Sequence, residues 1–192
     1  MFVQILLFIL DAVCGFMTLA LLVRFAMQWA RVPFRNPLGQ FIVAVTDWMV
    51  RPVRRLIPGL FGLDMASLFL AWLWQVAYQG IALGFSGVLA AVSPAPTFVV
   101  ALLALLEVAK IGLYLVIGAV IVSAVFSWVN PYAPLAGVFN TLTQPLLRPF
   151  RRFIPPVGGV DLSPLALLLV LQIALVVLDG LRRSILPLML VS

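Results

Sequence analysis

The chain has 192 residues, of which 65% are hydrophobic and only 9% are charged, and its formal net charge is +6. A soluble domain carries about 25% charged residues, so this composition excludes a soluble globular protein and indicates one that lies mainly in lipid. The single cysteine, Cys14, cannot form an internal disulfide, and the absence of histidine removes the commonest general base and metal ligand. We therefore expect no enzyme activity, no cofactor and no metal site.

Four apolar segments are long enough to cross a membrane, which requires about 20 apolar residues. They cover residues 3–28, 66–92, 98–128 and 164–190. The short connectors between them leave no room for a separate soluble domain. The fold class that follows is an all-α membrane protein with four transmembrane helices.

The first apolar segment carries Asp11 deep inside it and ends near Arg24 and Trp29. Trp29 suits the headgroup level, and Arg24 can extend to that level along its own aliphatic stem. No basic residue precedes the segment, so we expect it to remain as an anchor and not to be removed as a signal peptide.

The third segment carries Glu107 and Lys110, and charged residues inside a span are usually paired. Two arrangements are open at this point. Glu107 and Lys110 could pair with each other one turn apart, or Asp11, Lys110 and Glu107 could form a cluster between helices. Gln75 and Gln172 lie 97 residues apart in the second and fourth segments, and we predict that they hydrogen-bond to each other.

The connectors that follow the first and third segments correspond to each other at one fixed offset of 97 residues. This offset relates Arg51-Pro52 to Arg148-Pro149, Arg54-Arg55 to Arg151-Arg152, Pro58 to Pro155, and Asp64 to Asp161. A fixed offset between uncommon residues indicates a duplication. We therefore divide the chain into two parallel units, residues 1–92 and 93–192, each with two spans and an Arg-Pro-rich connector.

Each connector begins with a stretch that is too short to span a membrane. In residues 38–50 and 135–146 the apolar side chains recur at helical spacing. This pattern favours an amphipathic helix lying in the membrane interface. The alternative is an irregular loop folded onto the spans.

Arginines follow at positions i, i+3 and i+4, a spacing that places their heads on one side of a helical turn. They are Arg51, Arg54 and Arg55 in the first unit and Arg148, Arg151 and Arg152 in the second. Pro52 and Pro149 are tolerated if they open that turn. Two interpretations remain open: a cradle for anionic phospholipid or an acidic protein partner, or only the positive charge that marks cytoplasmic connectors.

The second connector ends in a turn at Gly158-Gly159, where a positive φ is allowed. Asp161 or Ser163, followed by Pro164, is then typical of a helix N-cap. Asp64 is expected to cap a helix in the same way in the first unit.

The second unit resembles the YggT family of small bacterial and plastid membrane proteins, also called YlmG. The resemblance is carried by Trp128, Asn130-Pro131, Thr143, Pro145, Arg148-Pro149, Arg151-Arg152, Pro155, Gly158-Gly159, Asp161 and Ser163-Pro164. The first unit matches more loosely. The resemblance implies links to osmotic-stress tolerance, to division-site gene neighbourhoods and, in plastid relatives, to cytochrome assembly and nucleoid distribution, with no shared biochemical activity.

Topology follows from the arginines beside the spans. Eight of them flank the two connectors, whereas only Arg182 and Arg183 lie on the opposite side. The positive-inside rule then predicts cytoplasmic connectors and outward termini, here in a bacterial inner membrane.

The function predicted from these features is that of a non-enzymatic organising or assembly protein. Its arginines would bind anionic phospholipid or an unidentified membrane or cytoplasmic protein. The expected partners also include further copies of this chain in a homo-oligomer, but no direct nucleic-acid contact. The alternative is an oligomeric cation channel or transporter subunit active under osmotic stress, with Asp11, Glu107 and Lys110 as its sensitive positions.

Overall fold

A computed structural model describes residues 1–57, 59, 62–85, 95–154 and 161–185. This part of the chain is helical and contains six helices. They are α1 (Phe2–Trp29), α2 (Pro37–Leu56), α3 (Met65–Phe85), α4 (Ala95–Val129), α5 (Ala136–Phe153) and α6 (Ser163–Ile185).

Four of these helices are long and apolar enough to cross a membrane. They are α1, α3, α6 and, within α4, Phe98–Ser127. They match the four spans predicted from hydropathy, except that the predicted ends at residues 92 and 190 lie outside the described residues. Most side chains in these stretches face outward, as expected for helices that have lipid as their solvent. The molecule is therefore a multi-pass membrane protein.

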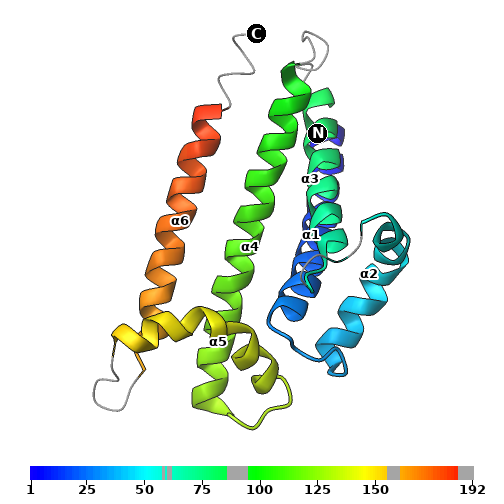
Figure 1. Cartoon of the computed structure of the whole chain (residues 1–192). Coiled ribbons are helices and arrows are strands. Elements are labelled where there is room, and N and C mark those ends of the chain that lie inside the picture. Colours follow the sequence, from blue (N-terminus) through cyan, green and yellow to red (C-terminus); the bar gives the residue numbers. More distant parts are fainter. Residues whose placement is uncertain (58, 60–61, 86–94, 155–160, 186–192) are drawn as a thin grey trace.

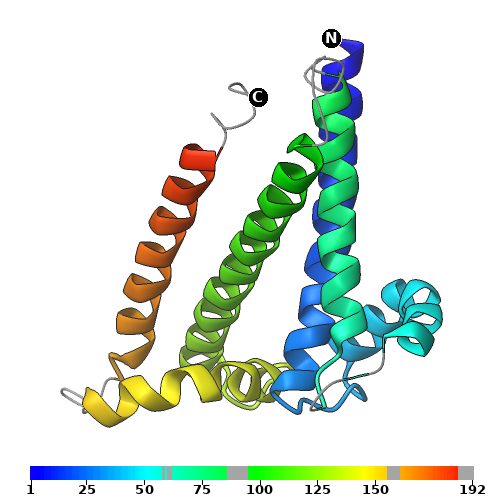
Figure 2. The same ribbon diagram turned by 45° about the horizontal axis from the view of Figure 1, so that its top comes forward.

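The four long helices stand side by side, and α2 and α5 lie at one end of them (Figure 1). α1 and α4 both run toward this end, whereas α3 and α6 run away from it. α1 packs most extensively on α3, and α4 contacts α1, α3 and α6. The substantial contacts of α6 are with α4 and α5 alone, and α5 crosses the ends of α4 and α6 (Figure 2).

The start of α2 shows why its sequence turns the chain sharply after α1. Asn36 caps the helix, because its Oδ1 accepts a hydrogen bond from the Gly39 amide at 2.8 Å, and Pro37 is the first helical residue. A Cβ at Gly39 would lie 2.7 Å from the Cα of Phe34. Glycine is thus required here by the close approach of two backbone segments.

Both connector helices extend further than the sequence predicted. α2 and α5 run on through the arginine-proline elements to Leu56 and Phe153, so Pro52 and Pro149 lie inside helices and do not open new turns. Both are exposed, where the lost backbone hydrogen bond can be replaced by a polar solvent. The buried sides of the two helices pack on the spans, with Val50 against Leu21 on α1 and Leu147 against Val120 on α4.

Candidate functional site

A buried arginine joins three helices at the end of the first unit. Arg24 on α1 is only 5% exposed. Its guanidinium donates to Thr46 Oγ1 at 2.8 Å, to Asp47 Oδ1 at 2.9 Å and to Asp64 Oδ2 at 3.3 Å. The expectation that Arg24 extends to the headgroups is therefore wrong, because internal carboxylates lie closer and satisfy its charge.

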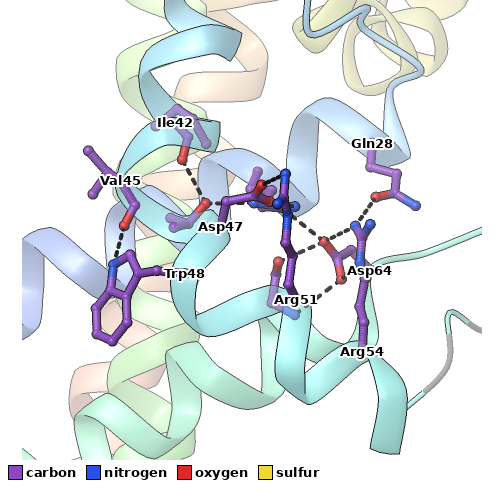
Figure 3. Close-up of polar contacts among 11 residues, drawn as sticks. Gln28, Ile42, Val45, Asp47, Trp48, Arg51, Arg54 and Asp64 are labelled. Atoms are coloured by element: carbon purple, nitrogen blue, oxygen red, sulfur yellow. Dashed lines mark hydrogen bonds and ion pairs between the residues drawn. The ribbon is translucent and has the colours of Figure 1, made fainter.

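Asp64 is the centre of this network, and its carboxylate is almost fully buried. It accepts hydrogen bonds from the Ser67 amide and hydroxyl, which caps α3, and it also accepts from Arg54. Gln28 links Arg54 to Gly62, which lies just before α3. Its Oε1 accepts a hydrogen bond from Arg54, and its Nε2 donates to the carbonyl of Gly62. Figure 3 shows Gln28 and Arg54 meeting beside Asp64. We call this group, with Arg51, the Asp64 cluster; its members are Arg24, Gln28, Thr46, Asp47, Arg51, Arg54, Asp64 and Ser67.

The Asp64 cluster makes the fold sensitive to acid. Burial alone would raise the pKa of Asp64, but hydrogen bonds from Arg54 and Ser67 outweigh burial and hold it below the ordinary 3.8. As pH falls, Asp64 is therefore protonated in the unfolded chain before it is protonated in the folded protein. The stabilisation is complete above about pH 4 and is lost as pH falls through the lower folded pKa.

We expect the free energy of unfolding to decline below about pH 4, and to decline less steeply in an Asp64→Asn variant. Unfolding in mixed SDS micelles at a series of pH values would measure both slopes. Equal slopes in the two proteins would contradict the assignment, and Asp161→Asn serves as the matched control in the second unit.

The second unit has a simpler version of the same arrangement. Arg151 Nε lies 2.9 Å from Asp161 Oδ2, and Asp161 Oδ1 accepts from the Ser163 amide. The position that aligns with Arg24 is Ser123, whose hydroxyl lies 2.6 Å from Asn140 Oδ1. With no buried arginine here, the Asp161 side chain is 40% exposed.

The six arginines predicted to form a cradle differ in what they contact. Arg51 pairs with Asp47, Arg54 with Asp64, and Arg151 with Asp161. Arg55, Arg148 and Arg152 are exposed and have no ion pair within the described residues. Arg54 and Arg151 thus fasten their connectors internally, while these three arginines remain open to an anionic ligand.

Inside the membrane, α4 and α6 are joined by two ion pairs. Lys110 Nζ lies 2.9 Å from Asp179 Oδ1, and Arg182 Nη1 lies 2.7 Å from Glu107 Oε2. Both arrangements proposed from the sequence are therefore wrong: Lys110 pairs with neither Glu107 nor Asp11. On each helix the acid precedes the base by three residues, and because α4 and α6 run in opposite directions, each acid lies beside the base of the other helix.

The predicted pair of glutamines also does not form. Gln75 is buried and its Nε2 donates to Thr18 Oγ1 on α1 at 3.0 Å. Gln172 is exposed on the outer side of α6. The reason is that α3 packs on α1 and α4, whereas α6 packs on α4 and α5, so α3 and α6 have no substantial contact.

Comparison with known proteins decides the family. The sequence profile of the CCB3/YggT family matches residues 3–85 and 102–182, which together make up most of the chain. The chain belongs to the CCB3/YggT family. This confirms the resemblance noted from the sequence.

Two bacterial relatives align with this chain over most of their length, and a plant relative aligns over a shorter stretch. An uncharacterized protein of Pseudomonas aeruginosa is 38% identical over 170 residues, covering 86% of this chain and 84% of the relative. The uncharacterized protein YggT of Escherichia coli is 37% identical over 167 residues, covering 86% and 85%. A chloroplastic YlmG homolog of Arabidopsis thaliana is 50% identical over 54 residues, which cover 27% of this chain and 21% of the relative. No solved structure matches the chain.

The residues that carried the YggT resemblance lie mainly at the connector end. Asn130 follows α4, and its Oδ1 accepts from the Tyr132 amide, while Pro131 is exposed in the same turn. Ser163 begins α6, with Pro164 second. The Ser163 hydroxyl is buried and has no hydrogen-bond partner among the described residues. Pro155, Gly158 and Gly159 lie outside the described residues.

Sequence reasoning missed three residues that take part in the Asp64 cluster or in the ion pairs between α4 and α6. No prediction was made for Asp47 or Asp179, and Arg182 was used only to assign the topology. The available signal was charge complementarity: Glu107 and Lys110 on one span face Asp179 and Arg182 on another. Within the described residues no three His, Cys, Asp or Glu side chains gather as metal ligands would.

Proposed function

We propose that this chain is a non-enzymatic organising or assembly protein of the bacterial inner membrane. Its functional surface would be the connector end, formed by α2 and α5, which binds anionic phospholipid and presents a platform for a protein partner. Placing this end in the cytoplasm, with the N-terminus outside, follows from its arginines. The proposal is supported by the position of both connectors at one end of the spans (Figure 1).

The observation that carries the proposal is a repeated pair of residues at the ends of the connector helices. Arg55 and Arg152 are exposed, and the next residues, Leu56 and Phe153, are 84% and 81% exposed. A large apolar side chain beside a guanidinium suits the boundary between acyl chains and phosphates. Arginine binds phosphate with two parallel hydrogen bonds, which favours a phospholipid headgroup as the ligand.

The remaining surface of α2 supports an interfacial position for this helix. Its buried residues include Ile42 and Met49, and Met49 packs on the spans. Phe41 and Trp48 are largely exposed, and the Phe41 ring meets Phe16 of α1 edge-on with ring centroids 6.5 Å apart. Aromatic residues of this kind concentrate where a protein crosses from lipid to water.

We also infer that residues 1–92 and 93–192 arose by duplication. The Arg54–Asp64 and Arg151–Asp161 ion pairs support this, because each joins residues that are ten positions apart in corresponding connectors. A duplicated unit would present two similar basic sites on one surface, and two weak lipid contacts on one body bind more tightly than either alone.

Photo-crosslinking in native membranes tests the proposed surface. The probe belongs at Phe153, because Phe150 between the arginines is partly buried against Leu147. We expect adducts with anionic phospholipid that decrease when Arg152 and Arg148 are changed to glutamine. A discrete protein adduct would identify a partner on the same surface. A probe at Val177, which faces outward from α6, gives the background for contact with bulk lipid; equal labelling at both sites would contradict the proposal.

A second candidate is an oligomeric cation channel or transporter subunit active under osmotic stress. It is favoured by a polar cavity among the spans, lined in part by Asp11 and Glu107. Adducts at Phe153 that contain only a second copy of this chain would favour this candidate. A channel should lose function on substitution of Asp11 or Glu107, whereas an organising protein should lose it on substitution of Arg55 or Arg152.

A further inference from the structure

A polar cavity of about 390 Å³ lies between the four spans, on the side away from the connectors. Its polar lining comes from Asp11 on α1, Gln75, Tyr78 and Gln79 on α3, Glu107 on α4 and Arg182 on α6. Asp11 is nine residues from the start of the 28-residue helix α1, or about 14 Å along the helix axis, and so lies within an apolar span. The cavity has room for several waters of about 30 Å³ each.

The charges around this cavity do not balance. Arg182 is paired with Glu107, so these two charges neutralise each other. Asp11 has no cation within ion-pair distance among the described residues. The Tyr78 hydroxyl lies beside Asp11, and a phenol brings no positive charge. The lining therefore holds two carboxyl groups and one guanidinium, and Asp11, an exposed position of α1, is the acid without a cationic partner.

An uncompensated carboxylate at this depth is unfavourable, because lipid cannot solvate its charge. The side chains beside Asp11 supply further oxygen atoms: a phenol from Tyr78 and amide carbonyls from Gln75 and Gln79. The Gln75 Nε2 donates to Thr18, which leaves its carbonyl oxygen to accept or to ligate. Carboxylate, carbonyl and water oxygens are the ligands that hard cations prefer.

We propose that this cavity binds one monovalent cation at Asp11. The single unpaired carboxylate matches a charge of +1, and the volume lets the ion keep part of its water shell. The inference uses no residue of the connector end and stands without the phospholipid-binding function. It would supply an ion site for the second candidate function.

Gly15 offers a way to test the site without removing its charge. It forms part of the cavity wall, and a Cβ built on it meets no atom within 4 Å. Gly15→Leu should therefore place a side chain in the cavity and exclude an ion. Gly80 on α3 has equally open space around its Cβ position but is not part of the cavity lining, so Gly80→Leu is the matched control.

The experiment is equilibrium binding of radiolabelled sodium and rubidium ions to the full chain in phosphatidylcholine nanodiscs. N-methylglucamine chloride keeps the ionic strength constant. We expect saturable binding of at least one of the two ions, at one ion per chain. Asp11→Asn and Gly15→Leu should each weaken it about tenfold or more, while Gly80→Leu and Asp11→Glu should retain it.

Two results would overturn the proposal. One is the absence of saturable binding of either ion to the unmodified chain. The other is binding that persists unchanged in both Asp11→Asn and Gly15→Leu. Because Asp11→Glu keeps the charge and Gly15→Leu keeps the carboxylate, a folding defect in Asp11→Asn alone does not decide the outcome. The nanodiscs contain no anionic lipid and no partner, so this test is independent of the function proposed for the connector end.

Discussion

Replacing Asp64 with asparagine is expected to lower the free energy of unfolding by about 3 kcal/mol, near the lower limit for removing one partner of a buried ion pair. The reason is that Arg24, 5% exposed, would lose one of its two carboxylates while Asp47 remains. Arg54 would lose its ion pair as well. Unfolding in mixed SDS micelles measures the change.

Two further variants show whether the stability lost in Asp64→Asn comes from the buried charge of Arg24. Asp161→Asn removes the corresponding carboxylate of the second unit, but that pair is half exposed and should contribute no more than about 1 kcal/mol. Arg24→Met combined with Asp64→Asn should lose less stability than the two single losses added together, by about 1 kcal/mol or more. Equal losses from Asp64→Asn and Asp161→Asn would contradict the role given to the buried arginine.

Replacing Lys110 with methionine is expected to lower the free energy of unfolding, because it leaves Asp179 without its cation. The effect should fall mainly on α6, whose other substantial contacts are with α5. A double-mutant cycle with Asp179→Asn should show coupling beyond the ~0.5 kcal/mol within which independent changes add.

The control for this cycle pairs Lys110→Met with Asp11→Asn. Asp11 lines the cavity, and it makes no ion pair with Lys110. These two changes should therefore add within about 0.5 kcal/mol. Coupling between Lys110 and Asp11, with none between Lys110 and Asp179, would show that the helices pack in a different register.

The positions of the spans could be predicted from the sequence because long apolar runs have few alternatives in lipid. The four predicted segments and the four observed spans agree closely at most ends. The connector helices were predicted too short, since Pro52 and Pro149 were expected to interrupt them. Proline's effect depends on whether its surroundings can satisfy the freed carbonyl, and exposure on the helix surface allows this.

The polar contacts could be predicted only in part, because their partners are distant in the chain. Arg24 reaches Asp64 across 40 positions, and Lys110 reaches Asp179 across 69. Alignment of the two units places Ser123 opposite Arg24, so the arginine is not a duplicated residue. A side chain present in only one of two duplicated units can still be essential there, when its neighbours have changed with it.

The two ways in which the units are fastened have a consequence for synthesis in the cell. Every member of the Asp64 cluster lies within residues 24–67, so its contacts can form as soon as α3 has left the ribosome. Glu107 and Lys110 have to wait for Asp179 and Arg182, about 70 residues later. During that interval α4 carries two unpaired charges, so the insertion machinery or the first unit must shelter it until the last helix arrives.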